Sequence, residues 1–282
     1  MVVEVNSKIS PSSARAHTRK ANQNSSFQLP PEVLNKLLVL LSVGILAWGY
    51  QAIQPPPPKI CGSLGGPPIT APRIKLSDGR NLAYKEEGVP KEGANYKIVS
   101  VHGFDSCRHD TIAKFLSPEL VEELGLYIVS FDRPGYGESD PNPKRTVKSM
   151  ALDIEELADQ LGLGSKLYVV GYSMGGEVLW SVLKYIPHRI AGAALLAPVA
   201  NYWWTGFPAN LSKEAYKKQL WNDQLAVGVA HYAPWLTYWW NTQKWFSSCS
   251  AVAHNPGVFS TKDRELVMMP HWQSRKTYVV PT

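Results

Sequence analysis

Residues 167–176 read Leu167-Tyr-Val-Val-Gly171-Tyr-Ser173-Met-Gly175-Gly, and they are the most informative stretch of the sequence. Its apolar, β-branched start predicts a short buried strand. Apolar side chains then recur at helical spacing over 174–186, which predicts a helix. The serine between the two elements must therefore stand on a sharp strand-to-helix turn.

A serine on such a turn is suited to attack an electrophile. A hydroxyl is a poor nucleophile until a base removes its proton and hydrogen-bond donors stabilise the oxyanion that forms. The turn exposes the hydroxyl and aims backbone N–H groups at the reacting atom. It is crowded, so small residues are needed two positions before and after the serine, where Gly171 and Gly175 stand. The alternative, a flexible glycine-rich loop, is disfavoured by the strand and helix on either side.

Two other segments have the same strand-then-turn pattern. Residues 96–101 predict a strand that runs into His102-Gly-Phe104. Residues 126–131 predict a second buried strand, which is followed by Asp132-Arg-Pro-Gly-Tyr-Gly-Glu-Ser139. In order and spacing, these motifs and the serine turn resemble the α/β-hydrolase superfamily over residues 73–200. The sequence of residues 102–110 is similar to that of a poorly characterised, membrane-anchored plant branch of this superfamily.

The resemblance implies an α/β fold, with a mostly parallel sheet flanked by helices and a partial helical cap. It also implies that Ser173 is the catalytic nucleophile of an esterase- or lipase-like serine hydrolase, with Gly171 and Gly175 forming the nucleophile turn. The backbone N–H groups of Phe104 and Met174 would then form the oxyanion hole. His102 belongs to the same turn, and its ring is expected to be structural rather than a base.

The rest of the core region supports alternating strands and helices. Residues 73–87 predict a hairpin, and 190–197 predict a further strand. Residues 146–162 predict an amphipathic helix, whose acidic residues, Asp153 among them, are expected on its solvated side. Such alternation requires a mostly parallel sheet with helices on both faces.

The N-terminal part of the chain predicts a membrane anchor. Residues 1–33 are polar and expected to be disordered, and 34–53 contain an apolar stretch long enough to span a bilayer as one helix. A proline-rich linker, 54–72, follows. Basic residues before the span place the N-terminus in the cytosol and the core across the membrane, which favours the secretory pathway and the endoplasmic reticulum. A buried core helix and an organellar leader are the alternatives.

Aromatic residues dominate the last segment, 201–282, which is expected to be a cap. Eight of the ten tryptophans lie there: Trp203, Trp204, Trp221, Trp235, Trp239, Trp240, Trp245 and Trp272. They predict a concave apolar pocket for a small lipophilic substrate or ligand. Alternatively, the rings pack the cap together or touch the bilayer. Asn210-Leu-Ser212 is a glycosylation sequon, usable if the predicted topology holds.

The acid and histidine of a triad are not found. In the superfamily they follow the serine on loops beyond the cap. The candidates after Ser173 are Asp223, Asp263, His188, His231, His254 and His271, and none follows a predicted strand. We therefore expect a C-terminally truncated hydrolase with impaired activity. The competing hypothesis is a non-catalytic binding protein of the same fold for an apolar ligand or a partner.

Charge and cysteines exclude other classes of function. The net charge of +6 is spread over 282 residues, which predicts no nucleic-acid partner. Cys61, Cys107 and Cys249 have no metal-ligand spacing and form no complete disulfide framework. We expect no metal and no cofactor.

Overall fold

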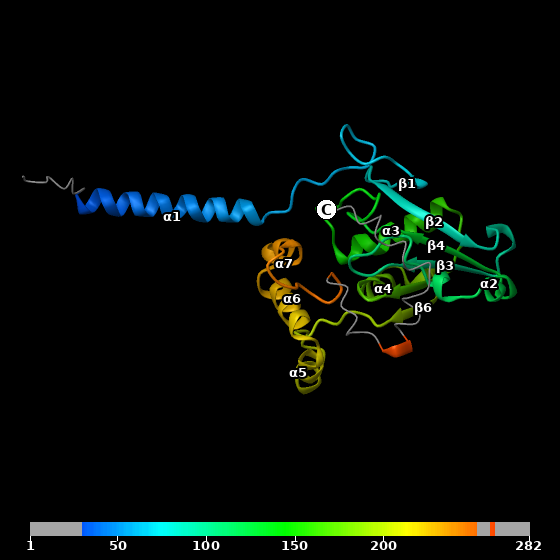
Figure 1. Cartoon of the computed structure of the whole chain (residues 1–282). Helices are drawn as coiled ribbons and strands as arrows, with labels where there is room; N and C mark the ends of the chain where they lie inside the picture. The colour runs from blue at the N-terminus through cyan, green and yellow to red at the C-terminus, as the bar shows by residue number, and fades with distance from the viewer. Residues whose placement is uncertain (1–29, 253–259, 263–282) are drawn as a thin grey trace, which may run out of the picture. The chain divides into compact units, whose positions relative to one another are not determined.

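Strands and helices alternate from Arg73 to Leu196 in the computed structural model, which describes residues 30–252 and 260–262 (Figure 1). The chain divides into two units, 1–52 and 53–282. A six-stranded sheet of order β1-β2-β4-β3-β5-β6 organises the second unit. Its strands are β1 (Arg73–Lys75), β2 (Asn81–Gly88), β3 (Tyr96–Val101), β4 (Leu126–Phe131), β5 (Leu167–Tyr172) and β6 (Ile190–Leu196).

The sheet is parallel where it positions the serine turn. β1 pairs with β2, and β2 with β4, in antiparallel fashion, whereas β3, β4, β5 and β6 pair in parallel. The carboxyl ends of the parallel strands therefore meet at one edge, and the loop after each strand emerges there. The expected α/β-hydrolase fold is confirmed, including the hairpin at 73–87.

Helices cover both faces of the sheet. On one face, α3 (Val147–Gln160) and α4 (Met174–Tyr185) pack on the strands, with Ile154 and Leu179 fully buried in the larger core cluster. On the other, Val121 of α2 (Pro118–Leu124) packs in a smaller cluster. The helix η3 (Ile112–Phe115) and α2 were not expected from the sequence. Two further short helices, η2 (Lys91–Gly93) and η4 (Pro187–Arg189), have no buried residues.

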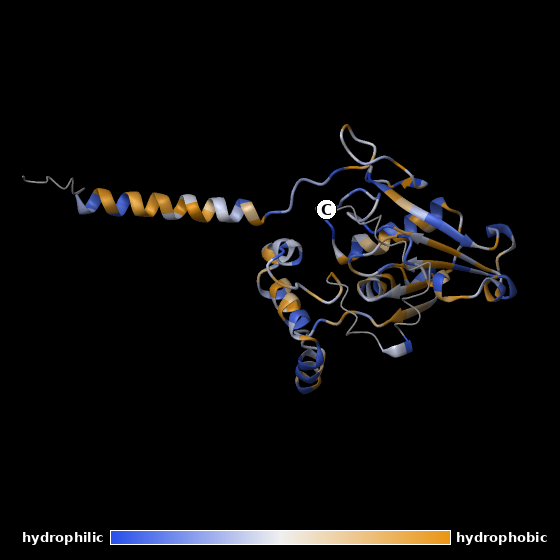
Figure 2. Ribbon diagram, viewed as in Figure 1, coloured by the Kyte–Doolittle hydropathy of each residue, from blue (hydrophilic) through white to orange (hydrophobic). Residues whose placement is uncertain are grey.

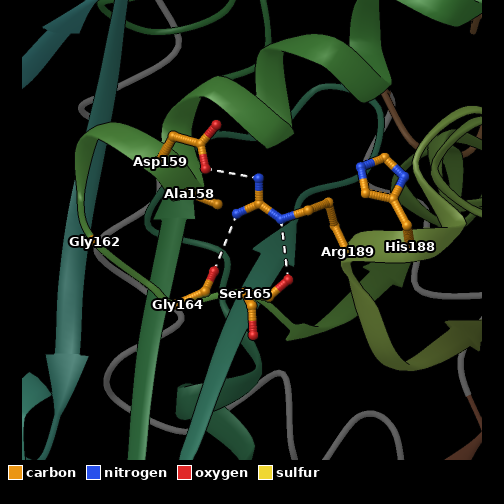
Figure 3. Close-up of a pocket in the computed structure, with 7 residues that line it drawn as sticks. All are labelled: Ala158, Asp159, Gly162, Gly164, Ser165, His188 and Arg189. Atoms are coloured by element: carbon orange, nitrogen blue, oxygen red, sulfur yellow. Dashed lines mark hydrogen bonds and ion pairs between the residues drawn. The ribbon is translucent and has the colours of Figure 1, made fainter.

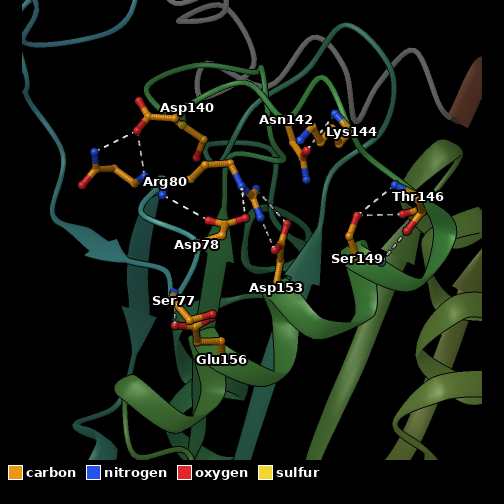
Figure 4. A network of polar contacts seen from close by, with 12 residues as sticks. Ser77, Asp78, Arg80, Asp140, Asn142, Lys144, Thr146, Ser149, Asp153 and Glu156 are labelled. Atoms are coloured by element: carbon orange, nitrogen blue, oxygen red, sulfur yellow. Dashed lines mark hydrogen bonds and ion pairs between the residues drawn. The ribbon is translucent and has the colours of Figure 1, made fainter.

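One acidic residue of α3 lies elsewhere than expected. Asp153 is buried rather than solvated, and its carboxylate pairs with the guanidinium of Arg80, which follows the turn between β1 and β2 (Figure 4). Glu156 of the same helix accepts hydrogen bonds from Ser77, and Thr146 caps the helix by accepting from the N–H of Ser149. Acidic residues of α3 thus bind the turn between β1 and β2.

The helix of the first unit, α1 (Pro31–Ile53), has no buried residue, and its length and apolar composition suit a membrane anchor or a signal sequence. Figure 2 shows its run of hydrophobic residues. It begins three residues before the expected start at 34, because proline is tolerated in the first turn of a helix.

The expected linker, 54–72, contains no helix or strand, but its second half is not a free spacer. Cys61 is buried, and the N–H groups of Thr70 and Ala71 donate to the Glu138 carboxylate at 2.8 and 3.1 Å. The linker therefore docks on the loop that follows β4.

Beyond β6 the described chain is helical, with α5 (Ala209–Lys218), α6 (Trp221–Tyr232), η5 (Pro234–Leu236) and α7 (Thr237–Thr242). Some rings pack together: Trp203 stacks on His231 with ring centroids 4.0 Å apart. Others, among them Trp221 and Trp245, are largely exposed. Trp272 lies outside the described residues.

Candidate active site

Ser173 occupies the turn between β5 and α4, and its backbone is strained. Its φ of 53° and ψ of −117° are rare for a residue with a side chain. Hydrogen bonds hold it there: its N–H donates to the Leu196 carbonyl at 2.9 Å, and its own carbonyl accepts from Val199 and Glu177, both at 3.2 Å. The turn is therefore clamped between the end of β6 and the start of α4.

The two glycines around the serine have no room for a side chain. A Cβ added at Gly171 would lie 2.4 Å from the Gly175 carbonyl oxygen. One added at Gly175 would lie 2.1 Å from the Val101 carbonyl oxygen at the end of β3. Real Cβ atoms do not approach so closely, so the turn can form only with glycine at both positions.

The His102–Phe104 turn lies against Ser173. A Cβ added at Gly103 would be 3.3 Å from the Ser173 Cβ, which places the two turns in contact. In the described part of the chain, the backbone N–H groups of Phe104 and Met174 donate to no protein acceptor. For Met174 this follows from its place as the first residue of α4, where helical N–H groups have no intrahelical partner. Two unused donors thus stand next to the serine.

His102 is structural and cannot act as the base. It is 2% exposed, and its Nε2 accepts a hydrogen bond from the Arg133 backbone N–H at 3.0 Å. The proton must therefore be on Nδ1, which lies 2.9 Å from the Gly103 carbonyl oxygen and donates to it. Burial and the nearby Arg133 charge hold the pKa of His102 well below its ordinary value, so the ring is neutral.

The loop after β4 is held by a buried ionic network. Asp132 is fully buried and accepts from the Arg108 guanidinium, the Arg108 N–H and the Glu138 N–H. Arg108 also donates to Glu138 at 2.6 Å. Burial raises the pKa of Glu138, but hydrogen bonds from Thr70, Ala71 and Arg108 outweigh it and lower that pKa to about 2. The hydrogen bonds of Asp132 with Arg108 and Glu138 therefore hold the loop in place.

Arg133 is a residue that sequence reasoning missed. It is 2% exposed, and its Nη2 donates to the Gly103 carbonyl oxygen at 2.7 Å. Its guanidinium lies over the Tyr136 ring, 4.6 Å from the centroid. The available signal was an arginine two residues after a strand that is expected to be buried, β4.

His188, a candidate base, lies at the wrong edge of the sheet. It precedes β6 and pairs with Glu155 at 3.1 Å. β5 and β6 run in parallel, with Leu167 opposite Ile190 and Tyr172 opposite Leu196. His188 therefore lies near the start of this pair and Ser173 at its end, about one strand length, or 17–20 Å, away. His188 therefore cannot reach the serine.

The other described candidates have structural partners. Asp223 accepts hydrogen bonds from the N–H and the hydroxyl of Ser250, both at 2.7 Å. His231 is stacked on Trp203. Asp263, His254 and His271 lie outside the described residues. Within the described part of the chain, the Ser173 hydroxyl makes no hydrogen bond to a histidine.

An open pocket of about 600 Å³ lies at the edge of the sheet opposite to Ser173 (Figure 3). The cation in its wall is Arg189, which donates to Asp159 at 2.6 Å and to the Gly164 and Ser165 carbonyls, both at 3.1 Å. These bonds tie the loop before β5 to α3. Arg189 therefore has a structural role, and the pocket is not part of the site around Ser173.

No group of three or more His, Cys, Asp or Glu residues in the described ranges could hold a metal ion. Cys61, Cys107 and Cys249 are free thiols, and burial raises the pKa of each. The arrangement around Ser173 thus places a serine hydroxyl beside two backbone N–H groups that have no acceptor in the described part of the chain.

Comparison with known proteins finds relatives that match part of the chain. The chain is 32% identical over 125 residues to a putative 2-succinyl-6-hydroxy-2,4-cyclohexadiene-1-carboxylate synthase of Bacillus subtilis, a match covering 43% of this chain and 42% of that protein. It is 31% identical over 127 residues to a non-heme chloroperoxidase of Streptomyces lividans, covering 45% and 44%. The chain thus spans less than half the length of these relatives.

Among solved structures, the chain is similar to a thermophilic esterase from Thermogutta terrifontis, with 23% identity, a TM-score of 0.42, and 73% and 70% of the two chains covered. The family of the alpha/beta hydrolase fold matches residues 97–257, which is more than half of the chain. This protein therefore belongs to the alpha/beta hydrolase family.

Proposed function

We propose that this alpha/beta hydrolase is a serine hydrolase, membrane-anchored through α1, that cleaves an ester or other acyl bond of a small lipophilic molecule. The observation that supports it best is the position of Ser173, strained on its turn beside the two unused N–H groups of Phe104 and Met174. Strained backbone that is clamped by its surroundings is typical of functional sites.

In the proposed reaction, the Ser173 Oγ forms a bond to the substrate carbonyl carbon while its proton passes to a base. The carbonyl oxygen becomes an oxyanion, which the Phe104 and Met174 N–H groups stabilise by hydrogen bonds. Collapse of this intermediate expels an alkoxide, which takes the proton and leaves as an alcohol. Water then hydrolyses the acyl-serine by the reverse sequence of proton transfers.

The aromatic segment supports a lipophilic substrate. The chain leaves β6, donates the Val199 N–H to the Ser173 carbonyl, and within a few residues enters the rings of Tyr202, Trp203 and Trp204. Of these rings Trp204 is exposed, and so close in sequence to the serine contact it offers a wall for an acyl chain.

The first test is labelling by a fluorophosphonate, together with hydrolysis of p-nitrophenyl esters, using the full chain in detergent. Wild type is compared with Ser173→Ala and with Ser165→Ala, a matched change at an exposed serine before β5. Labelling and turnover that are lost only in Ser173→Ala support the proposal and require a base within the chain.

A second function competes with this one. In the described residues Ser173 has no base, which favours a non-catalytic hydrolase fold that binds an apolar ligand. A wild-type chain that melts cooperatively but takes no fluorophosphonate label would contradict the hydrolase proposal and support binding.

The proposed topology has its own test. Asn210 is exposed at the start of α5, so its sequon is available to the glycosylation machinery if this region crosses the membrane into the secretory pathway. We expect the expressed chain to resist carbonate extraction and to lose mass on glycosidase treatment, whereas Asn210→Gln should not change. Extraction of the chain by carbonate would count against an anchoring role for α1.

A further inference from the structure

One peptide group joins the buried loop after β4 to the proposed oxyanion hole. The Gly103 carbonyl and the Phe104 N–H belong to the same peptide unit, and none of the described peptide bonds is cis. In a planar trans unit these two groups point in opposite directions. Whatever holds the Gly103 carbonyl therefore also sets the direction of the Phe104 N–H.

The Gly103 carbonyl is held twice. Arg133 donates to it from Nη2 at 2.7 Å, and the neutral His102 ring donates from Nδ1 at 2.9 Å. The His102 ring is in turn fixed by the Arg133 backbone N–H, which donates to Nε2 at 3.0 Å. Both holds thus depend on Arg133, one through its side chain and one through its main chain.

The Arg133 guanidinium has few polar partners other than the Gly103 carbonyl. In the described part of the chain, Arg133 forms no ion pair with a carboxylate, and its buried Nε has no hydrogen-bond partner. Its charge faces the Gly103 carbonyl and the Tyr136 ring. A charge-assisted hydrogen bond is stronger than a neutral one, and in a low-dielectric interior it polarises the peptide that accepts it.

We propose that Arg133 is a positioning residue of the oxyanion hole, which aims and polarises the Phe104 N–H by holding the Gly103 carbonyl. This inference rests on the proposed function, since it assigns Phe104 a role in stabilising the oxyanion. Arg133 itself does not touch the substrate. It acts through one peptide unit, whereas Met174 gains its free N–H from the start of α4.

The direct test is the backbone amide of Phe104, observed by NMR in the full chain labelled with 15N-phenylalanine. The chain has seven phenylalanines, and the Phe104 signal is identified by its loss in Phe104→Leu. Removing the hydrogen bond to the preceding carbonyl should move the Phe104 amide signal in Arg133→Met and leave the others in place. The matched control is Arg145→Met, which removes an exposed arginine and should move none.

Fluorophosphonate labelling gives a second readout. Loss of one oxyanion donor slows catalysis by about 10²–10³-fold, so Arg133→Met should slow labelling by up to about 10²-fold and lower kcat for p-nitrophenyl esters more than it raises KM. Arg133→Lys keeps the charge and one donor, and we expect it to restore part of the rate. This variant also serves if Arg133→Met does not fold.

The outcomes separate this inference from the proposed function. A folded Arg133 variant, Met or Lys, whose Phe104 signal stays at the wild-type position would overturn the positioning role, whatever its activity. A wild-type chain that takes no label, combined with a Phe104 signal that moves in Arg133→Met, would refute the hydrolase proposal and leave the positioning of the N–H supported.

Discussion

The two flanks of Ser173 are built differently. On the flank of β3 and β4, the loops are fixed by buried charges, with Arg108 between Asp132 and Glu138 and with Arg133 on the Gly103 carbonyl. On the other flank, every residue of β6 is exposed or only half-buried, and large rings of the following segment, such as Trp221, are exposed. Figure 1 shows this second flank as the edge strand β6 and the separate helices α5, α6 and α7.

The difference separates two tasks of the proposed site. Stabilising an oxyanion requires donors that are aimed before the reaction starts, and a dense network of buried hydrogen bonds provides that. Recognising an apolar group requires exposed rings that can adapt to it. Four variants test whether the two flanks differ in this way.

The largest effect is expected from Arg108→Met. The change leaves the Asp132 and Glu138 carboxylates buried without their cation, which typically costs about 3–5 kcal/mol. Denaturant unfolding of the full chain measures this loss as a change in the unfolding free energy of residues 53–282. The control is Lys218→Met, which removes a mostly exposed ion pair with Glu214 and should change stability by less than about 0.5 kcal/mol. Equal effects of the two variants would contradict the assignment of rigidity to the first flank.

Gly175→Ala comes next. The new Cβ would lie 2.1 Å from the Val101 carbonyl oxygen, so β3 or α4 must move, at a cost of about 1–3 kcal/mol. Labelling of Ser173 should fall together with the melting temperature. Gly93→Ala, where a Cβ meets nothing within 4 Å, is the matched control and should be close to neutral. A Gly175→Ala protein that is as stable as the control would mean that the turn is less crowded than described.

The pH dependence of stability tests the same network. The folded-state pKa of Glu138 is about 2, below its ordinary value of 4.5. A depressed carboxyl pKa stabilises the folded state above pH 4.5, and this contribution is lost as the pH falls from 4.5 towards 2. The difference in unfolding free energy between wild type and Glu138→Gln should therefore shrink over this range. A difference that is constant from pH 6 to pH 2.5 would show that the Glu138 charge is not involved.

The smallest effect on stability is expected from Trp221→Ser. This ring is 68% exposed, so the unfolding free energy should change by less than about 0.5 kcal/mol. If the ring contacts an acyl chain, hydrolysis of a long-chain ester should fall relative to a short-chain one. Trp203→Ser is the contrast, because it removes the stack on His231 and should destabilise the segment. A large loss of stability in Trp221→Ser would place the exposed ring in a packed interface.

The turn around Ser173 could be predicted because its signals are local. A β-branched run, two glycines and a helical period lie within twenty residues, and β5 and α4 follow them closely. The α/β fold followed from the alternation of such elements. By contrast, the short helices η3 and α2 carry too few residues for a clear apolar period, and they were not expected.

Contacts between distant segments could not be predicted. Helical periodicity puts Asp153 on the polar side of α3, but Arg80, seventy-three residues earlier, supplies a cation that makes its burial possible. Likewise, nothing local in the sequence of Thr70 or Glu138 indicates that the two meet. The role of Arg133 depends on a carbonyl thirty residues away. Each of these contacts satisfies a buried charge, and single-segment patterns do not report charge pairing over such separations.

The docking of the linker also has a mechanical consequence. If α1 is held in a bilayer, any lateral pull on the domain is transmitted along residues 54–60 to Cys61, which is buried. It then reaches the hydrogen bonds from Thr70 and Ala71 to Glu138, rather than the exposed strand edge. The same carboxylate is bound to Arg108, and through it to Asp132. A pull on residues 54–72 would thus act on the loop after β4, which the buried ionic network holds in place.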